Sequence, residues 1–230
     1  MDLQKYKYFK CKKCTGIFVY PIHERTFYLD TVTYLNDPKK YTKNMNLYGQ
    51  RWLMEEFEKL YESKTGNKGR GSLFEVGAGV GFLELFALAR GWNTKAIEIS
   101  DEAVRFGQEY LRVDIEQSTI EDYETRDTFD AIVMVEVLEH FSNPLAAVKK
   151  LRKLSKEKTI LFGTTPNTDS DYWKGSEQDI YVPDDHIFLF NKKSLKKFAK
   201  KAGIKNLTVK PFGSGENNDS NLMYAGVIRN

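Results

Sequence analysis

The sequence predicts an α/β fold: a doubly wound, mostly parallel seven-stranded sheet with an antiparallel hairpin at one edge. Three observations support this prediction. Short apolar runs alternate with segments of helical period between residues 72 and 163, a pattern typical of parallel βαβ units with helices on both faces of the sheet. A glycine-rich turn follows the first of these runs. Two strand-like runs at residues 206–228 follow each other without a helix between them, which favours a hairpin at the sheet edge.

The expected elements follow a regular order. The strands are expected at Leu73–Val76, Thr94–Ile99, Val113–Gln117, Ala131–Val135, Thr159–Gly163, Asn206–Phe212 and Leu222–Ile228, with short strand-like runs at Gly16–Tyr20 and Thr26–Leu29. The helices are expected at Leu47–Tyr61, Phe82–Arg90, Asp101 (as N-cap) to about Tyr110, Pro144–Leu154 and Ser194–Ala202. Lysines fill one face of the last helix, which indicates a solvated surface, with docking of a phosphorylated substrate or RNA as the alternative. The segment Thr164–Asp185 has no strong period and predicts a long loop of the kind that covers active sites.

Composition restricts the class of protein. The chain has 230 residues, 41% of them hydrophobic, and 35 basic minus 32 acidic residues leave a net charge of +3; this is an ordinary globular composition. Every apolar run is far shorter than the ~20 residues of a membrane helix. The basic first residues lack the apolar segment of a secretory signal. We therefore expect a cytoplasmic protein without membrane contact. The small net charge argues against a dedicated nucleic-acid binder, and the oligomeric state is left open.

The strongest functional signal is the run Leu73-Phe74-Glu75-Val76-Gly77-Ala78-Gly79-Val80-Gly81-Phe82. A buried strand enters a glycine-rich turn and then a helix, so a ligand can approach bare backbone and a helix N-terminus. The dinucleotide fingerprint G-x-G-x-x-G would need a glycine at Phe82. Glu98 ends the second strand, 98 − 77 = 21 residues after the first glycine, where a carboxylate accepts hydrogen bonds from ribose hydroxyls.

These residues resemble motif I and the following acidic position of class I S-adenosylmethionine (SAM)-dependent methyltransferases. Further marks of that family are Phe129-Asp130, Val-Leu-Glu-His at 137–140, Thr-Pro-Asn at 165–167 and Asp-His-Ile-Phe-Leu-Phe at 185–190. The resemblance implies the Rossmann-like methyltransferase fold, with SAM as cofactor and S-adenosylhomocysteine (SAH) as product. It implies cofactor contacts from Glu75, Gly77, Ala78, Gly79, Gly81, Phe82, Glu98, Ile99, Thr119, Ile120 and Glu136. Many relatives carry an aspartate at the adenine position, where this chain has Thr119. The alternatives are a purely structural turn and a nicotinamide-dependent oxidoreductase.

Two of the three histidines, His140 and His186, lie within these marks. A hydroxyl or protonated amine must lose a proton when it is methylated, so a base near neutral pKa is needed. We predict His186, oriented by Asp185, or His140 as that base. Glu136, Glu139 and His140 are spaced to share one helical face.

The cluster also resembles the Glu-x-x-Glu-His of quinone-biosynthesis O-methyltransferases and small-RNA 3′-end 2′-O-methyltransferases, members of which bind magnesium or manganese there. The alternatives to a metal-free base are therefore a cation at Glu136, Glu139, His140 and His186, or a structural role for these residues.

We expect an N-terminal cap over residues 1–62 and a SAM-binding catalytic domain over residues 63–230, joined at the glycine-rich run Ser63–Gly71. Cys11 and Cys14 resemble one knuckle of the zinc ribbon that precedes related sugar methyltransferases. A structural zinc needs four ligands, and His23 adds only a third. We predict a degenerate knuckle that keeps the turn and lacks the metal.

The combined prediction is a SAM-dependent methyltransferase with a small-molecule acceptor. O-methylation of a sugar, nucleotide sugar or cell-surface polysaccharide precursor comes first, because the N-terminal leader and the C-terminal tail resemble those of sugar methyltransferases. The alternatives are an N-methyltransferase of a small phosphorylated amine, a metal-dependent RNA 2′-O-methyltransferase, and a SAM-binding scaffold without activity.

Overall fold

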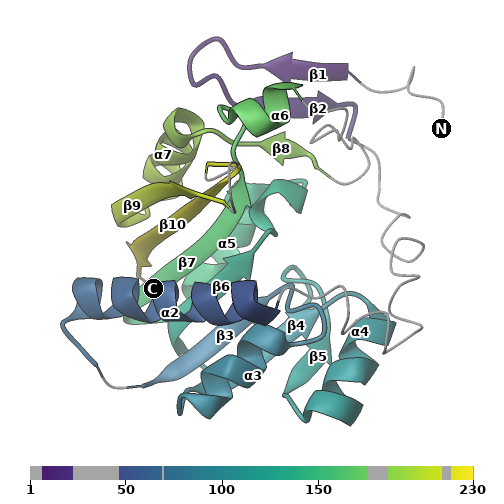
Figure 1. The fold of residues 1–230 in the computed structure, drawn as a ribbon, viewed down its shortest axis with the longest axis vertical. Coiled ribbons are helices and arrows are strands. Elements are labelled where there is room, and N and C mark those ends of the chain that lie inside the picture. The colour runs from purple at the N-terminus through teal and green to yellow at the C-terminus, as the bar shows by residue number, and fades with distance from the viewer. Residues whose placement is uncertain (1–6, 23–46, 69, 176–185, 214–218, 230) are drawn as a thin grey trace.

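The computed structural model describes residues 7–22, 47–68, 70–175, 186–213 and 219–229 (Figure 1). The strands are β1 (Lys7–Lys10), β2 (Ile17–Tyr20), β3 (Ser72–Val76), β4 (Asn93–Glu98), β5 (Ile115–Gln117), β6 (Phe129–Val135), β7 (Ser155–Pro166), β8 (Phe188–Leu189), β9 (Lys205–Phe212) and β10 (Asn221–Ile228). The helices are α2 (Leu47–Thr65), α3 (Phe82–Ala89), α4 (Asp101–Phe106), the π-helix η4 (Gly107–Leu111), the 3-10 helix η5 (Leu138–His140), α5 (Pro144–Lys153), α6 (Asp171–Gly175) and α7 (Lys192–Lys201). The predicted strand-like run Thr26–Leu29 lies outside the described residues.

Seven strands of the described residues form one sheet in the order β5-β4-β3-β6-β7-β10-β9. The first five of these are parallel to one another, whereas β10 runs antiparallel to both β7 and β9. The predicted fold class, including the antiparallel hairpin, is confirmed. The later strand of the hairpin lies inside the sheet, between β7 and β9.

Helices cover both faces of this sheet. On one face α2 and α3 pack together, and the ring of Phe57, which is fully buried, lies 5.2 Å from Trp92 and 5.5 Å from Phe162. On the other face α5 and α7 contribute Leu151 and Leu195 to the buried cluster that also contains Phe74. Truncating a fully buried phenylalanine such as Phe57 costs about 3–5 kcal/mol of stability, so α2, which contains Phe57, is part of the core. Within the described ranges, no helix combines the length and hydrophobicity required to cross a bilayer.

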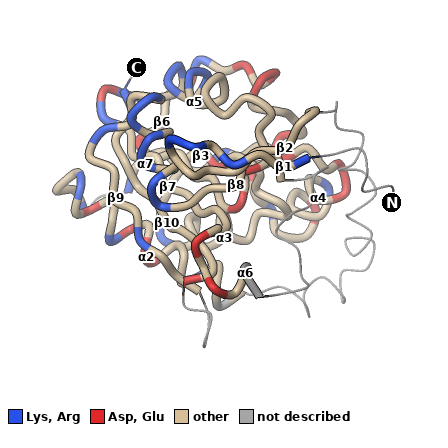
Figure 2. Tube along the Cα trace, turned by 90° about the horizontal axis from the view of Figure 1, so that it is seen from above, with Lys and Arg blue, Asp and Glu red and all other residues tan. Residues whose placement is uncertain are grey.

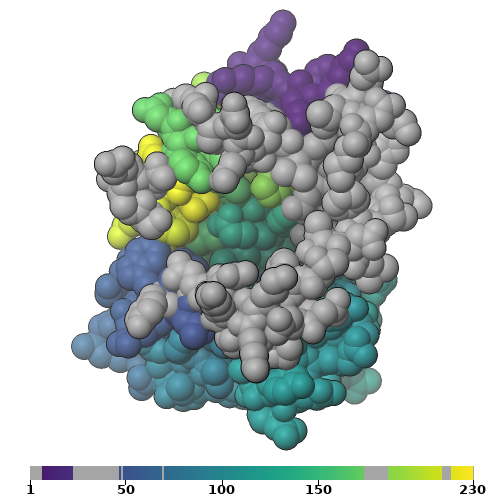
Figure 3. Space-filling view, turned by 45° about the vertical axis from the view of Figure 1, so that its right-hand side comes forward, coloured from purple at the N-terminus to yellow at the C-terminus, as the bar shows by residue number. Residues whose placement is uncertain are grey.

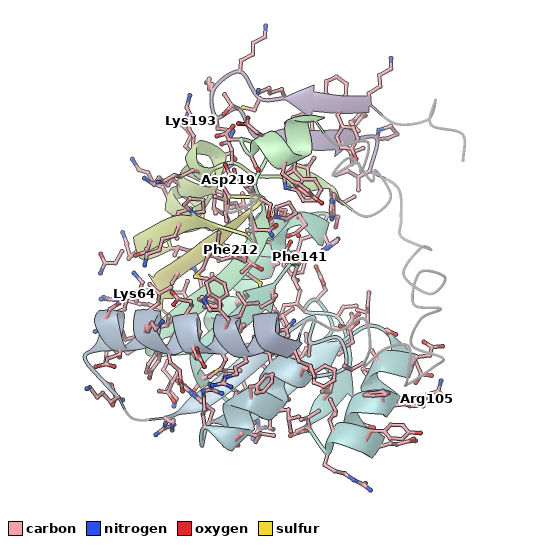
Figure 4. All side chains as sticks on the ribbon, viewed as in Figure 1. Lys64, Arg105, Phe141, Lys193, Phe212 and Asp219 are labelled. Carbon is pink, nitrogen blue, oxygen red and sulfur yellow. The ribbon has the colours of Figure 1, made fainter. Side chains whose placement is uncertain are left out.

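Helix α2 is longer than predicted. It continues to Thr65, so the first residues of the predicted linker are helical and the predicted domain boundary at residue 62 falls inside a helix. Gly66, at φ +71°, follows its last turn. Lys64 donates hydrogen bonds to the Asn206 carbonyl (2.7 Å) and the Thr208 hydroxyl (3.0 Å) of β9, which fixes the end of the helix (Figure 4). The division of the chain into a cap and a catalytic domain stays a prediction.

The predicted N-cap of α4 was wrong. Ser100, not Asp101, is the N-cap of α4, because its hydroxyl accepts the Ala103 N–H and its backbone is extended. The helix expected to reach about Tyr110 is α-helical to Phe106 and continues as a π-helix to Leu111, so its predicted end is confirmed within one residue.

The predicted loop at 164–185 begins with ordered elements. Strand β7 pairs with β10 as far as Pro166, and α6 follows; residues 176–185 lie outside the described part.

Strands β1, β2 and β8 form a second, small sheet. It lies at the end of the molecule opposite α3 and α4 (Figures 1 and 3). Cys11 and Cys14 lie in the β1–β2 turn, where the Cys11 N–H donates to Gly16 O (2.8 Å) and the Cys11 carbonyl accepts the Thr15 N–H (2.8 Å). The backbone N–H groups of Cys14 and Lys13 lower the pKa of the Cys11 thiol to about 7. The chain turns between Cys11 and Cys14, His23 lies outside the described residues, and both the resemblance to a zinc-ribbon knuckle and the expected lack of zinc stay predictions.

The lysine-rich helix α7 is amphipathic as predicted. Leu195 and Ala199 are buried, and its lysines are exposed. Figure 2 shows this helix as a basic stretch, while acidic and basic residues mix over much of the rest of the chain.

Candidate functional site

The turn after β3 requires glycine for both conformation and space. Gly77, Gly79 and Gly81 have φ values of +71°, +56° and +87°, in the region that favours glycine. A Cβ atom at Gly77 would lie 2.6 Å from Val137 Cγ2, and one at Gly81 would lie 2.7 Å from Ile115 Cδ1. Gly77, Ala78 and Gly79 are only half-buried, so the bare backbone is open to a ligand, beside the N-terminal residue Phe82 of α3.

The Glu98 carboxylate connects this turn to the end of β4. One carboxylate oxygen accepts the Gly79 N–H (2.8 Å), and the other accepts the N–H groups of Ile99 (2.9 Å) and Ser100 (3.0 Å). Hydrogen bonds from backbone amides to a carboxylate are strong. The predicted acid of the second strand therefore lies beside the glycine turn and also fixes its geometry.

Two more carboxyl groups lie beneath the turn. Glu75 is 2% exposed, and its Oε2 has no hydrogen-bond partner among the described residues. Burial, and then the charges of Glu84 and Glu98, raise the pKa of Glu75 well above its usual value. Burial, and then the charge of Asp114, raise the pKa of Glu84 to about 8. Acidic groups beside bare backbone fit SAM, which carries a sulfonium and an amino group.

The predicted adenine residues lie next to Glu98. The Ser118 N–H donates to the Glu98 carbonyl (3.0 Å), which places Thr119 and Ile120 at the same edge. The Thr119 hydroxyl donates to Asp122 Oδ2 (2.8 Å), and the Ile120 side chain is buried. A contact of Thr119 or Ile120 with adenine stays a prediction.

The second part of the site begins at the carboxyl end of β6. Glu136 has φ +52° and precedes η5, so the prediction that it shares one helical face with Glu139 and His140 was wrong. Its N–H donates to the Thr164 carbonyl and hydroxyl (both 3.2 Å) at β7. Burial raises the pKa of the Glu136 carboxyl, and the Thr164 hydroxyl, His140 and Glu139 oppose this shift.

Glu139, His140 and His186 come together although 46 residues separate the two histidines in the sequence. The two imidazole rings lie 5.0 Å apart at 55°, and His140 Nε2 is 3.9 Å from Glu139 Oε1. One ligand atom from each of the three residues lies within 4.8 Å of the others. This group, called the Glu139–His140–His186 cluster below, can act as a proton acceptor or hold a cation. Asp185, predicted to orient His186, lies outside the described residues.

The cofactor turn and the cluster are neighbours. Val137, whose side chain packs on Gly77, is followed by η5, and its carbonyl accepts the His140 N–H (3.0 Å). Phe141, directly after His140, lies in the middle of the molecule, between the β1–β2 hairpin and α2 (Figure 4). A methyl donor at the glycine turn would therefore lie close to the two imidazoles.

Sequence reasoning missed Tyr224 of β10. Its ring lies over Gly163 of β7, because a Cβ there would be 2.4 Å from the Tyr224 hydroxyl and 2.4 Å from the Met134 carbonyl. The hydroxyl is buried without a hydrogen-bond partner among the described residues. Burial, and then the charges of Glu139 and Glu136, raise the pKa of Tyr224 well above its usual value. In the sequence, only the glycine at position 163, inside an apolar strand, indicates that another side chain packs closely there.

Such a sheet, with a glycine turn and an acid at the ends of adjacent parallel strands, is typical of SAM-dependent methyltransferases. The family described as "Methyltransferase domain" matches residues 41–209, and the chain belongs to this family.

Curated relatives agree over part of the chain. The ubiquinone biosynthesis O-methyltransferase of Actinobacillus pleuropneumoniae serotype 7 (strain AP76) is 30% identical over 106 residues, which cover 41% of this chain and 45% of that protein. The protein of the same name from Nitrosomonas europaea is 28% identical over 103 residues, covering 42% and 44%. The match thus spans less than half the length of these relatives.

Solved structures show the same fold. The plantazolicin methyltransferase BpumL, in complex with a triazolic desmethylPZN analog and SAH, has a TM-score of 0.66 at 16% identity, covering 86% of this chain and 93% of that one. A SAM dependent methyltransferase from Archaeoglobus fulgidus has a TM-score of 0.64 at 14% identity, covering 83% and 100%.

Proposed function

We propose that the protein transfers the methyl group of SAM to a hydroxyl of a small polar metabolite, and that the acceptor oxygen binds at the Glu139–His140–His186 cluster. The observation that supports this best is that two imidazole rings lie 5.0 Å apart. One of them, that of His140, is close in the chain to Val137, whose side chain packs on Gly77 of the cofactor turn. The names of the curated relatives favour O-methylation over N-methylation. The acceptor class is a sugar, a nucleotide sugar or a polysaccharide precursor, and the location is the cytoplasm.

The chain contributes alignment and a proton acceptor. SAM supplies a methyl group activated by a positively charged sulfur. The glycine turn and Glu98 would hold the donor, and the cluster would hold the acceptor, so that the entropy of bringing the two together is lost on binding rather than in the reaction. An imidazole of His186 or His140 would take the hydroxyl proton as the oxygen bonds to the methyl carbon and the bond from that carbon to sulfur breaks, which leaves SAH. Glu139 beside His140 would stabilise the resulting imidazolium.

The test is a methyl-transfer screen with labelled SAM over sugars, nucleotide sugars, phosphorylated amines and a phenol of the quinone-precursor type. His186→Ala and His140→Ala are then compared with the wild type. We expect one of them to lose turnover by about 10²-fold or more, with SAH affinity by calorimetry unchanged. Near-normal turnover in both variants would remove the proposed base, and methylation of the amines alone would replace the hydroxyl acceptor.

A second candidate is supported by the 4.8 Å spacing within the cluster: O-methylation assisted by a divalent cation. Two imidazoles and one carboxylate suit a transition-metal ion better than Mg²⁺, which prefers oxygen ligands. Mn²⁺ is the test ion, because the resemblance to quinone-biosynthesis and small-RNA methyltransferases implies magnesium or manganese at this cluster. Loss of activity in a chelator and recovery with Mn²⁺ would favour this candidate, with Glu139→Gln as the variant that binds Mn²⁺ more weakly. Methylation of RNA that falls steeply with salt would instead favour the RNA enzyme.

A further inference from the structure

We propose that the N-terminal hairpin β1–β2 positions His186, acting through strand β8. This inference rests on the proposed role of His186. The hairpin would then be part of the apparatus of methyl transfer, although residues 7–20 lie far from the cluster in the sequence.

Strand β2 of the hairpin pairs with β8, the short strand that follows His186. Strand β8 is two residues long, and it pairs antiparallel with β2 at Ile17–Leu189 and Phe18–Phe188. The Val19 N–H extends this pairing by donating to the Ile187 carbonyl (3.0 Å). A strand this short has little stability of its own, so its position depends on β2.

The residue next to His186 is bound from two sides. The Ile187 N–H donates to the Glu139 carbonyl (2.9 Å), while its own carbonyl accepts the Val19 N–H. The side chains of Ile187 and Val19 are 2% and 1% exposed. The peptide after His186 is therefore held between the cluster and the hairpin. A shift of the hairpin would displace the His186 ring relative to His140.

The hairpin is itself fixed to the start of α7. A Cβ at Gly16 would lie 2.8 Å from the Ser194 Cβ, so the turn lies against the helix. The Asn191 side-chain amide, whose oxygen caps α7, donates to the Thr15 hydroxyl (2.8 Å). The hairpin thus joins a rigid helix on one side to the cluster on the other, which is what a supporting element of a catalytic residue requires.

The experiment removes one hydrogen-bond donor. Val19→Pro deletes the N–H that binds Ile187. Lys10→Pro is the matched control, because the Cys11 N–H faces Gly16 and alternation along an antiparallel strand turns the Lys10 N–H to the outer edge of β1. Gly16→Ala, which must move the turn off Ser194, tests the same inference should Val19→Pro fail to fold. Readouts are hydrogen exchange of the Ile187 amide, the histidine ring resonances, SAH affinity, and turnover on the acceptor that the screen identifies.

We expect Val19→Pro and Gly16→Ala to speed Ile187 exchange, to shift the His186 ring resonances and to lower turnover by about 10²-fold. SAH affinity should stay within two-fold of the wild type, and Lys10→Pro should match the wild type throughout. Unchanged Ile187 exchange or unchanged His186 resonances in a folded Val19→Pro protein would overturn the inference. If the resonances shift and turnover does not, positioning by the hairpin stands and the proposed catalytic role of His186 fails.

Discussion

The cofactor turn and the Glu139–His140–His186 cluster are neighbours in space, yet they are built in different ways. The turn uses residues 75–100, where β3, α3 and β4 follow one another, and its shape is set by three left-handed glycines and one carboxylate. The cluster combines η5 with the segment before β8, supported by the hairpin β1–β2 and approached by Tyr224 from β10. Changes far along the chain can therefore alter the acceptor side and leave the cofactor side intact.

The two regions also differ in charge. The carboxyls of Glu75 and Glu84 near the turn are buried close to other acids, which raises the pKa of both. In the cluster, Glu139 lies beside His140, and the neighbouring Glu136 also interacts with that histidine. A cationic ligand can offset the repulsion among the acidic groups near the turn. The cluster instead contains a histidine that can offset the charge of its carboxylates.

The largest expected effect comes from a side chain in the turn. In Gly77→Ala the new Cβ meets Val137 at 2.6 Å, and the residue must keep φ +71°. Strain of about 1–2 kcal/mol and overpacking of about 1–3 kcal/mol should together lower the free energy of unfolding by about 2–5 kcal/mol, measured by chemical denaturation. SAH affinity should fall with it.

Gly66→Ala is the control for this change, because Gly66 has the same φ, +71°, and no atom within 4 Å of the added Cβ. It should show the strain alone. Equal losses in the two variants would mean that space at the turn does not matter.

A second effect tests the charge difference through pH. Because the folded-state pKa of Glu84 is raised from 4.5 to about 8, the unfolded chain releases this proton between those pH values while the folded chain keeps it. The contribution of Glu84 therefore lowers wild-type stability as pH rises through this window. Glu84→Gln should gain up to about 1.4 kcal/mol per pH unit relative to the wild type.

Thermal or urea unfolding from pH 4.5 to 8 measures this difference. The control is Glu116→Gln, on the exposed surface of β5. A Glu84→Gln difference that stays constant with pH would contradict the raised pKa.

A smaller effect is expected from the cluster's remote neighbour. Tyr224→Phe removes the buried hydroxyl near the carboxylates of Glu139 and Glu136, to which it can donate a hydrogen bond once the acceptor is bound. A hydrogen bond of about 1 kcal/mol corresponds to about five-fold in turnover, with SAH affinity unchanged. The control is Tyr123→Phe, whose ring stacks on Phe74 at 4.9 Å in the core. Equal turnover in the Tyr224 variant and the wild type would assign the hydroxyl a packing role only.

The smallest effect is expected outside both regions. Lys95 Nζ lies 2.7 Å from Asp127 Oδ2, with both side chains about half exposed. Lys95→Ala should cost less than about 1 kcal/mol of stability, and less still in high salt. SAH affinity and turnover should match the wild type. A change in either would mean that the cofactor side extends to this surface.

The cofactor side could be predicted because its signals are local. The glycine spacing and the acid at Glu98 identify one βαβ unit, and Thr119 and Ile120 follow from the next strand. The cluster could be predicted only as a set of residue types. Its geometry depends on pairings such as Phe18 with Phe188, across 170 residues, which no local pattern encodes.

The place of β10 also bears on how the chain reaches its fold. Both of its partners, β7 and β9, precede it in the sequence, so each exposes an unpaired edge until residues 221–228 have left the ribosome. Such edges are templates for association with other chains. A nascent chain whose synthesis is paused before this segment should therefore bind chaperones or aggregate. It should become monodisperse once β10 is made and pairs with β7 and β9.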